Sequence, residues 1–322
     1  MKVLITGIDG FTAKYLARHL TAEGCSVTGS YLLAGEHLRD ISDDVTLRPL
    51  DVTDADACGE LVNDEKPDIL FHLAAQSAPA LSWAKPQLTA RVNIEGSINI
   101  LEAVRDLPAC RVMLIGSAEE YGQVDPDEVP IDEDQPYRPR NLYGVTKIAQ
   151  TMIADLYVKG YGMDIVTVRA FNHIGPGQSE DFVVSDFASQ IARIQLGMIP
   201  PVIHVGNLSG KRDFTDVRDM VRAYWLAAQE GEPGGVYNIG TGVELSIQEV
   251  LDRLIALCPV PIEVRVDQDR YRPCDVPVLV CDSTRIRELT GWEPKIDLDL
   301  TLRDVLSDWI EKLQKEKNGG EQ

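Results

Sequence analysis

The first thirteen residues constrain the fold of this chain more than any other stretch. A short apolar run, Lys2–Thr6, leads into the turn Gly7-Ile-Asp-Gly10-Phe-Thr-Ala13, and a helical pattern of apolar residues follows. A strand, a glycine turn and a helix in this order form a setting in which a dinucleotide pyrophosphate meets backbone N–H groups and the positive end of a helix. Gly7 would allow the tight turn, and Gly10 would let the phosphates approach the backbone.

The chain continues as an alternation of short apolar strands with helices through residue 170. This alternation predicts an α/β fold, a Rossmann-type doubly wound parallel sheet with helices on both faces. After residue 171, turn residues and shorter elements predict a smaller mixed α/β lobe. We expect the dinucleotide-binding domain to span 1–171, with 211–240 returning to it. We expect 172–210 and 241–314 to form a substrate-binding lobe and 315–322 to fray.

The end of the second predicted strand bears on the choice of cofactor. An acid there would bind the adenosine ribose diol, whereas a basic residue would accept a 2′-phosphate. The sequence reads Ser30-Tyr31-Leu32-Leu33, and the nearest acid and arginine are Glu36 and Arg39. The missing acid favours NADP(H), with NAD(H) as the alternative.

Ser117, Tyr143 and Lys147 are the candidate catalytic residues. Tyr143 and Lys147 stand four apart at the start of a helical pattern, so they share one helix face. An ammonium beside the phenol would lower the pKa of the tyrosine and let it exchange a proton with a substrate hydroxyl. Ser117 ends a predicted buried strand, where its hydroxyl could hold the same oxygen. By itself such a tyrosine–lysine pair is more often a solvated surface pair.

Composition and charge exclude several classes of function. The net charge of −20 argues against broad nucleic-acid binding, which needs a basic surface. No apolar run approaches the roughly 20 residues that span a bilayer, and no apolar stretch of signal-peptide length is present, so we expect a cytoplasmic protein. The six cysteines form no CxxC pair, and we expect no metal site.

A set of motifs, in the same order along nearly the whole chain, resembles the extended short-chain dehydrogenase/reductase family. The motifs are Thr6-Gly7-x-x-Gly10-Phe11, Asp51-Val52, His72-Leu-Ala-Ala75, Ser117, Tyr143-x-x-x-Lys147, Arg212-Asp-Phe-x-Asp-Val-x-Asp219 and Gly291-Trp-x-Pro294. Within its nucleotide-sugar branch, the runs from Phe171 to Gln178, Val205 to Leu208 and Arg272 to Pro277 look most like GDP-4-dehydro-6-deoxy-D-mannose reductases. GDP-mannose 4,6-dehydratases are the next most similar group.

The resemblance implies a role for each matching residue. Tyr143 would be the acid/base at the C4 oxygen of the sugar, Lys147 would tune it and bind the nicotinamide ribose, and Ser117 would bond the same oxygen. The cofactor would also contact Gly7, Gly10, Phe11, Thr12, Ser30, Asp51, Val52, Leu73, Ala74 and Ala75. A GDP-sugar would contact Gln76, Ser117, Glu119, Asn172, Arg212 and Arg272. A lone histidine in a Pro/Gly loop, His173, is expected to be structural.

Glu119 separates the possible reactions. A 4,6-dehydratase needs a base for the C5 proton and an acid for the C6 hydroxyl, and Ser117-Ala118-Glu119 fills only the first requirement, because Ala118 cannot donate a proton. We therefore expect reduction of the C4 ketone of a GDP-4-dehydro-6-deoxy-mannose-type sugar, giving GDP-rhamnose or its C4 epimer. The alternatives are a GDP-mannose 4,6-dehydratase with tightly bound NADP, a 4-epimerase, and a non-catalytic nucleotide-binding protein.

The resemblance also implies a homodimer built through helices, one of which carries Tyr143. Four apolar positions on that helix could form the contact: Ile148, Met152, Ile153 and Leu156. The same positions could equally belong to the core, and the pattern does not separate the two.

Overall fold

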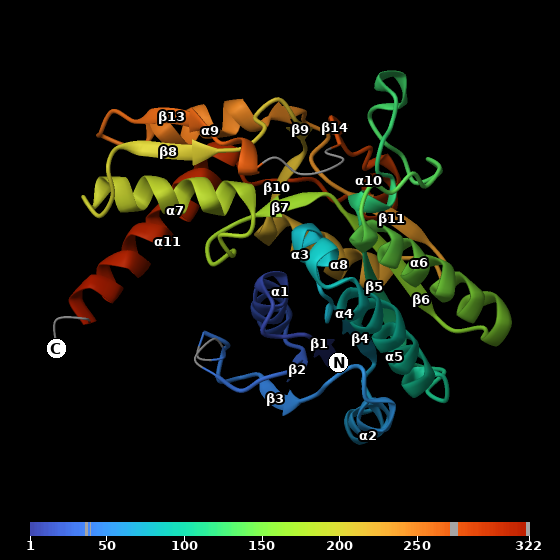
Figure 1. The fold of residues 1–322 in the computed structure, drawn as a ribbon. Coiled ribbons are helices and arrows are strands. Elements are labelled where there is room, and N and C mark those ends of the chain that lie inside the picture. The colour runs from blue at the N-terminus through green and yellow to red at the C-terminus, as the bar shows by residue number, and fades with distance from the viewer. Residues whose placement is uncertain (36–37, 39, 271–275, 320–322) are drawn as a thin grey trace.

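A seven-stranded parallel sheet forms the centre of the computed structural model, which describes residues 1–35, 38, 40–270 and 276–319 (Figure 1). The strand order is β3-β2-β1-β4-β5-β6-β11, and all neighbours pair in parallel. The predicted Rossmann-type fold is therefore confirmed. The strands are β1 (Lys2–Thr6), β2 (Ser26–Tyr31), β3 (Thr46–Pro49), β4 (Ile69–His72), β5 (Arg111–Ser117), β6 (Ile165–Ala170) and β11 (Val236–Ile239).

Helices cover both faces of the sheet, which explains why the central strands read as continuous apolar runs. One hydrophobic cluster joins the sheet to α1 (Phe11–Ala22), α8 (Val217–Glu230) and α10 (Thr284–Thr290). A second joins it to α2 (Ala55–Glu65), α5 (Gly96–Val104) and α6 (Leu142–Tyr161). The short helices α3 (Pro79–Ala84) and α4 (Pro86–Ala90) and a π-helical turn, Arg91–Glu95, precede α5.

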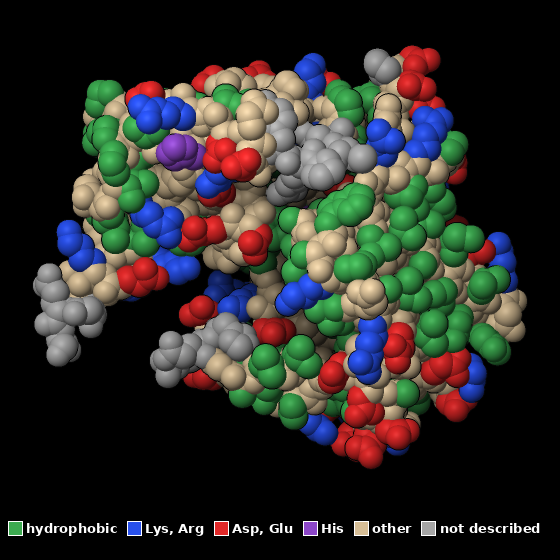
Figure 2. Space-filling view, in the orientation of Figure 1, with side chains coloured by type: hydrophobic (Ala, Val, Ile, Leu, Met, Phe, Trp, Pro, Cys, Tyr) green, Lys and Arg blue, Asp and Glu red, His purple; other side chains and the backbone are tan. Residues whose placement is uncertain are grey.

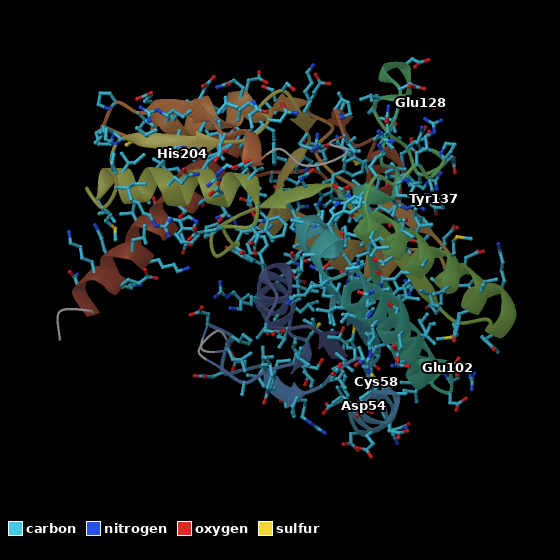
Figure 3. The ribbon with its side chains drawn as sticks, viewed as in Figure 1. Asp54, Cys58, Glu102, Glu128, Tyr137 and His204 are labelled. Atoms are coloured by element: carbon cyan, nitrogen blue, oxygen red, sulfur yellow. The ribbon has the colours of Figure 1, made fainter. Side chains whose placement is uncertain are left out.

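Polar side chains fix where several of these helices begin. Asp54 accepts a hydrogen bond from the Ala57 N–H at the start of α2 (Figure 3). Asn141 accepts one from Gly144 N–H at 2.8 Å at the start of α6. Each cap satisfies a backbone donor that has no partner inside the helix. For α6 this cap also places the first turn, which carries Tyr143.

The lobe lies beyond the carboxyl ends of the strands and has its own hydrophobic core (Figure 1). Its helices are α7 (Val183–Gln195), α9 (Ile247–Ala256) and α11 (Leu298–Gly319). Small sheets pair β7 (Asn172–Ile174) with β10 (Phe214–Asp216), β8 (Val202–Val205) with β13 (Glu263–Val266), and β9 (Lys211–Arg212) with β12 (Leu245–Ser246) and β14 (Val278–Leu279). 3₁₀ turns cover Ala118–Glu120, Pro126–Glu128 and Gln268–Arg270.

Two details differ from the expected division of the chain. Ile286 and Trp292 pack in the core between α8 and the sheet, although 241–314 was assigned to the lobe. The last helix, α11, continues to Gly319, so residues 315–319 are helical where fraying was expected. Within the described residues, no helix is both long and apolar enough to cross a bilayer.

Candidate active site

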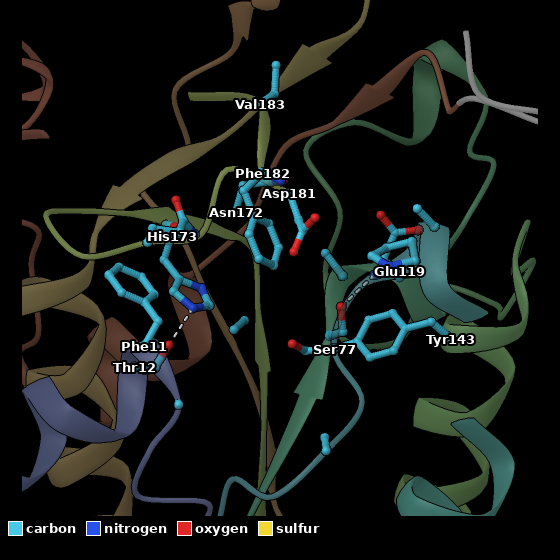
Figure 4. Close-up of a pocket in the computed structure, with 18 of the residues that line it drawn as sticks. Phe11, Thr12, Ser77, Glu119, Tyr143, Asn172, His173, Asp181, Phe182 and Val183 are labelled. Carbon is cyan, nitrogen blue, oxygen red and sulfur yellow. Dashed lines mark hydrogen bonds between the residues drawn. The ribbon is translucent and has the colours of Figure 1, made fainter. Parts of the chain in front are cut away.

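A cavity of about 1250 Å³ opens between the carboxyl edge of the sheet and the lobe. Figure 2 shows the molecule hollowed there, and Figure 4 shows the side chains that face one another across it. Most of the residues predicted from the sequence line this cavity. They are Gly7, Gly10, Phe11, Thr12, Ser30, Asp51, Val52, Leu73, Ala74, Ala75, Ser117, Glu119, Tyr143, Lys147, Asn172 and Arg212.

The glycine turn after β1 fits the shape that a dinucleotide requires. Gly7 has φ +73°, and a Cβ built on it would lie 2.7 Å from the Ala74 Cα. Only glycine tolerates both the backbone conformation and the close approach. Gly10 is the residue before α1, so the N–H groups of the first helical turn lie at the cavity wall. Such a helix N-terminus is suited to a pyrophosphate.

The end of β2 reaches the cavity through Ser30, which is buried, and Leu32, which is exposed. Glu36 and Arg39, the nearest acid and arginine in the sequence, lie outside the described residues. The four residues directly after β2, Leu32 to Gly35, include no acid, and the NADP(H) prediction rests on this absence.

The first turn of α6 packs tightly against the segment after β5. A Cβ built on Gly144 would lie 2.4 Å from the carbonyl oxygen of Glu119, so a side chain there would push the two segments apart. This contact brings Tyr143 close to Ser117, whose side chain lowers the pKa of the phenol. The Glu119 carboxylate lies beside them and accepts a hydrogen bond from Asn141 Nδ2 at 2.7 Å (Figure 4).

The prediction that Lys147 lowers the pKa of Tyr143 is wrong. Lys147 Nζ lies 5.7 Å from the centre of the Tyr143 ring and donates to the Ile115 carbonyl at 2.7 Å. Burial raises the pKa of Tyr143, and the neighbouring Ser117 side chain offsets this rise only in part. Burial also lowers the pKa of Lys147 from 10.5 to about 8. The phenol is therefore protonated at neutral pH, because desolvation disfavours its charged form.

Beneath these residues, a buried carboxylate joins three elements. Glu120 accepts hydrogen bonds from Ser117 N–H at 2.9 Å, from Thr151 Oγ1 at 3.0 Å and from Arg169 Nε at 3.0 Å. Arg169 also donates to Tyr137, which lies with Glu128 on the connection from β5 to α6 (Figure 3). Sequence reasoning missed this network. An arginine inside the apolar run of β6 was the signal that could have indicated it, since a buried charge needs a partner.

Gln76 is not where the prediction placed it. Its side-chain amide donates to the Ala78 carbonyl at 3.2 Å and accepts from Thr89 Oγ1 at 3.0 Å. Its backbone is held by Asn93 on the π-helical turn. The cavity is lined by the next residue, Ser77, instead (Figure 4). Arg272, predicted to contact substrate, lies outside the described residues.

His173 joins the glycine-turn helix to the lobe. Its Nδ1 donates to the Phe171 carbonyl at 3.2 Å, so in the neutral ring Nε2 accepts from Thr12 Oγ1 at 2.8 Å. Its ring is stacked with Phe11, with centroids 6.1 Å apart (Figure 4). Burial lowers the pKa of His173, which keeps the ring neutral. These contacts fit the structural role expected for it.

The cavity lining includes aromatic residues that were not predicted, among them Trp83 and Tyr224. Trp83 on α3 is 54% exposed, in contrast to Trp225, Trp292 and Trp309, which are buried. Tyr224 on α8 is fully buried, and its hydroxyl has no hydrogen-bond partner among the described residues. A tyrosine on the apolar face of a predicted helix was the available signal for the second. Within the described part of the chain, no cluster of His, Cys, Asp and Glu could hold a metal ion.

Comparison with known proteins identifies relatives along almost the full chain. A sequence model of the family described as GDP-mannose 4,6 dehydratase matches residues 4–305. The GDP-6-deoxy-D-mannose reductase of Pseudomonas aeruginosa is 34% identical over 98% of this chain and 99% of its own length. The human GDP-mannose 4,6 dehydratase is 29% identical over 98% of this chain and 93% of its own length. The structure of RMD from Pseudomonas aeruginosa complexed with NADPH superposes with a TM-score of 0.84, at 31% identity, over 97% of this chain and 99% of that one.

The burial of Lys147 predicts how stability depends on pH. The pKa of this lysine is about 8 in the folded protein against 10.5 for a free side chain, so the unfolded chain binds the extra proton between these values and stability rises with pH across that window. Lys147→Met should raise the free energy of unfolding at pH 7 by roughly 2 kcal/mol. Removing the cost of burying the ammonium would add about 3 kcal/mol to the free energy of unfolding. Losing the hydrogen bond to the Ile115 carbonyl would remove about 1 kcal/mol.

Urea denaturation at pH 7, 8, 9 and 10 measures this effect. The difference in free energy of unfolding between Lys147→Met and the wild type should decrease as the pH rises from 8 toward 10. Lys159→Met is the matched control, because this exposed lysine is at the other end of the same helix. A gap that stayed constant with pH, or that Lys159→Met reproduced, would contradict the assigned burial of the ammonium.

Proposed function

The chain belongs to the GDP-mannose 4,6-dehydratase family, and from this premise we propose that it is an NADPH-dependent reductase of a nucleotide sugar. Its substrate is a GDP-4-dehydro-6-deoxy-mannose-type sugar, and its product is GDP-rhamnose or the C4 epimer. The observation that carries the proposal is that Ser117 and Tyr143 lie close together in the lining of the cavity. The full-length likeness to a GDP-6-deoxy-D-mannose reductase supports this substrate class.

The reaction adds a hydride to C4 of the sugar and a proton to its C4 oxygen. When bound, NADPH supplies the hydride. Tyr143 donates the proton, and burial keeps its phenol in the protonated form that reduction needs. Ser117 holds the same oxygen, and the Lys147 ammonium balances the tyrosinate left after proton transfer. The tyrosinate then regains a proton from solvent before the next turnover.

The residues of the cavity divide between cofactor and sugar nucleotide. Gly7, Gly10 and the first turn of α1 would hold the cofactor pyrophosphate, and Asp51 and Val52 would contact its adenine. NADPH is favoured over NADH because the four residues directly after β2, Leu32 to Gly35, include no acid, and because the Pseudomonas aeruginosa RMD structure contains NADPH. Asn172 and Arg212 contact the diphosphate or ribose of the substrate, a role for which Arg272 stays a prediction. Ser77 takes the place that was predicted for Gln76.

Glu119 keeps a 4,6-dehydratase as the second candidate. Its carboxylate lies in the cavity and is oriented by Asn141, as a base for the C5 proton would need to be. Loss of water also needs an acid at the C6 hydroxyl, and the neighbouring Ala118, which lines the cavity too, has no proton to give. This missing acid is why we place the reductase first.

Two incubations distinguish these reactions. One contains GDP-mannose alone, and the other contains the GDP-4-keto-6-deoxy sugar with NADPH or NADH, with absorbance followed at 340 nm and products identified by mass spectrometry and NMR. We expect NADPH oxidation and a GDP-6-deoxyhexose in the second alone, with Glu119→Gln keeping substantial activity. Loss of water from GDP-mannose, abolished by Glu119→Gln, would establish the dehydratase instead. No reaction in either incubation would contradict both.

Tyr143→Phe tests the proton donor. The variant should lower kcat by about 10²–10⁴-fold, the range typical of general acid catalysis. NADPH affinity should change little, because the ring that lines the cavity is retained. Stopped-flow turnover together with NADPH titration separates the two quantities. Turnover equal to that of the wild type would remove Tyr143 from the mechanism.

A homodimer is the second part of the proposal. The four apolar positions of α6 differ in burial: Ile153 packs against the core and Ile148 is half-buried, whereas Met152 and Leu156 are 57% and 65% exposed. Figure 2 shows hydrophobic side chains gathered over this side of the molecule. We propose that this face pairs with the same face of a second copy, since exposed apolar patches mark interfaces. The cytoplasmic location stays a prediction.

Leu156→Glu should convert the dimer to a monomer, because each interface would then bury two carboxylates without partners. Light scattering coupled to size-exclusion chromatography measures the mass. Val266→Glu is the control, since Val266 is 55% exposed on β13 in the lobe, far from α6 (Figure 1). A wild-type monomer, or a Leu156→Glu dimer, would contradict the proposed interface.

A further inference from the structure

The part of the cavity that lies in the lobe contains an aspartate whose orientation is fixed by the protein. Asp186 lies in the first turn of α7, and Gln190 lies one turn further along that helix. The Gln190 side chain bonds both backbone groups of His204 on β8: Oε1 accepts from its N–H at 3.0 Å, and Nε2 donates to its carbonyl at 3.1 Å (Figure 3). Gln190 Nε2 also donates to Asp186 Oδ2 at 3.0 Å. The carboxylate is therefore anchored to β8.

Arg270 binds the same carboxylate oxygen. Its Nη1 donates to Asp186 Oδ2 at 2.9 Å, and both residues line the cavity. Asp186 Oδ1 receives no hydrogen bond from the described residues, and the side chain is 21% exposed, so a ligand in the cavity can reach it. Burial raises the pKa of Asp186, and Arg270 and Gln190 offset this rise only in part. Donors from a ligand would therefore replace water that these two partners do not.

The surroundings of Asp186 suit a flat nucleotide base. Four apolar side chains of the lobe core line this part of the cavity: Val183, Phe187, Leu208 and Ile247. The loop 206–210 begins against Arg270, because a Cβ built on Gly206 would lie 2.8 Å from the Arg270 carbonyl oxygen. The loop leads to Arg212 on β9, which is proposed above to contact the diphosphate or ribose. With the sugar directed toward Tyr143, the base extends from Arg212 the other way, toward Asp186.

We propose that Asp186 and Arg270 read the Watson–Crick edge of a guanine base. The inference rests on the GDP-sugar of the proposed function and assigns its base to named residues. Along this edge guanine presents one acceptor, O6, followed by two donors, N1–H and the amino group at C2. Arg270 donates to O6 with an N–H group that Asp186 does not use. Asp186 Oδ1, which has two lone pairs, accepts from N1–H and from the amino group.

The order of donor and acceptor in this pair opposes the other bases. Adenine has a donor in place of O6 and an acceptor in place of N1–H, so it mismatches both residues. Uracil matches with O4 and N3–H, but its O2 would face the carboxylate. Hypoxanthine differs from guanine only by lacking the amino group. A site built to hydrogen-bond a ligand group rejects an analogue without that group. Asp186 is therefore a specificity-determining residue for the base.

Asp186→Asn tests the assignment because it changes hydrogen bonding and not size. The amide oxygen would take the Oδ2 position that Arg270 and Gln190 bind, so the amide NH₂ would face the donors of guanine. Isothermal titration with GDP, IDP and UDP measures the result. The wild type should bind GDP about 10-fold more tightly than IDP. The variant should bind GDP about 10- to 100-fold more weakly than the wild type, and its GDP and IDP affinities should agree within about 3-fold.

Glu263→Gln is the matched control. It breaks an exposed carboxylate–arginine pair with Arg265 on β13, in the same lobe but outside the cavity lining. This control should bind all three nucleotides as the wild type does. The ratio of GDP to IDP affinity compares two ligands on one sample, so partial unfolding of Asp186→Asn does not imitate the expected result.

An Asp186→Asn protein that keeps the wild-type preference for GDP over IDP would overturn the assignment. A wild type that does not distinguish GDP from IDP would overturn it as well. If the wild type also bound UDP as tightly, the guanine of the proposed function would be contradicted too. These titrations use no sugar and no cofactor, so failure of the proposed reduction and failure of this base contact are distinguishable.

Discussion

The buried ion pair of Glu120 and Arg169 is the interaction on which the site depends. The carboxylate binds the Ser117 N–H at the end of β5, the arginine of β6 and Thr151 in the middle of α6. A buried charge that loses a partner costs several kcal/mol, so these three elements cannot shift independently. Because β5 and α6 are fixed in this way, Ser117 and Tyr143 meet at the edge of the cavity. The geometry of the proposed proton transfer would thus be set one layer below Ser117 and Tyr143.

Burial then decides the protonation of the site. The same exclusion of water raises the pKa of Tyr143 and lowers that of Lys147, because it disfavours whichever form is charged. A free protein with a protonated phenol is suited to give a proton, which is the direction of ketone reduction. Lys147, next to Tyr143, has a lower pKa than an ordinary lysine. Its positive charge is best stabilised when a tyrosinate forms nearby. The site therefore favours proton donation by Tyr143 because of desolvation more than because of the charge of Lys147.

The cavity joins two parts of the chain that were predicted separately. The turn at Gly7 and the first turn of α1 belong to the domain built on the seven-stranded sheet, whereas His173 and Pro176 belong to the connection into the lobe. His173 bonds Thr12, and Tyr15 donates to the Pro176 carbonyl at 2.9 Å. The wall that would hold the cofactor is therefore tied directly to the segment that leads to the sugar site. A ligand that spans both parts meets a surface already assembled.

The sequence by itself determined the parallel sheet and the glycine turn, because strand and helix periodicity and turn chemistry are local properties. Its resemblance to the extended short-chain dehydrogenase/reductase family predicted Tyr143 in the cavity. The tertiary structure decided the rest. It turned Gln76 away and presented Ser77, it covered Ile153 and left Met152 exposed on the same helix, and it reversed the expected direction of the Tyr143 pKa shift. Each of these depends on how much water the neighbouring segments exclude. Periodicity places residues on a face of an element, but only packing between distant segments determines which face is covered.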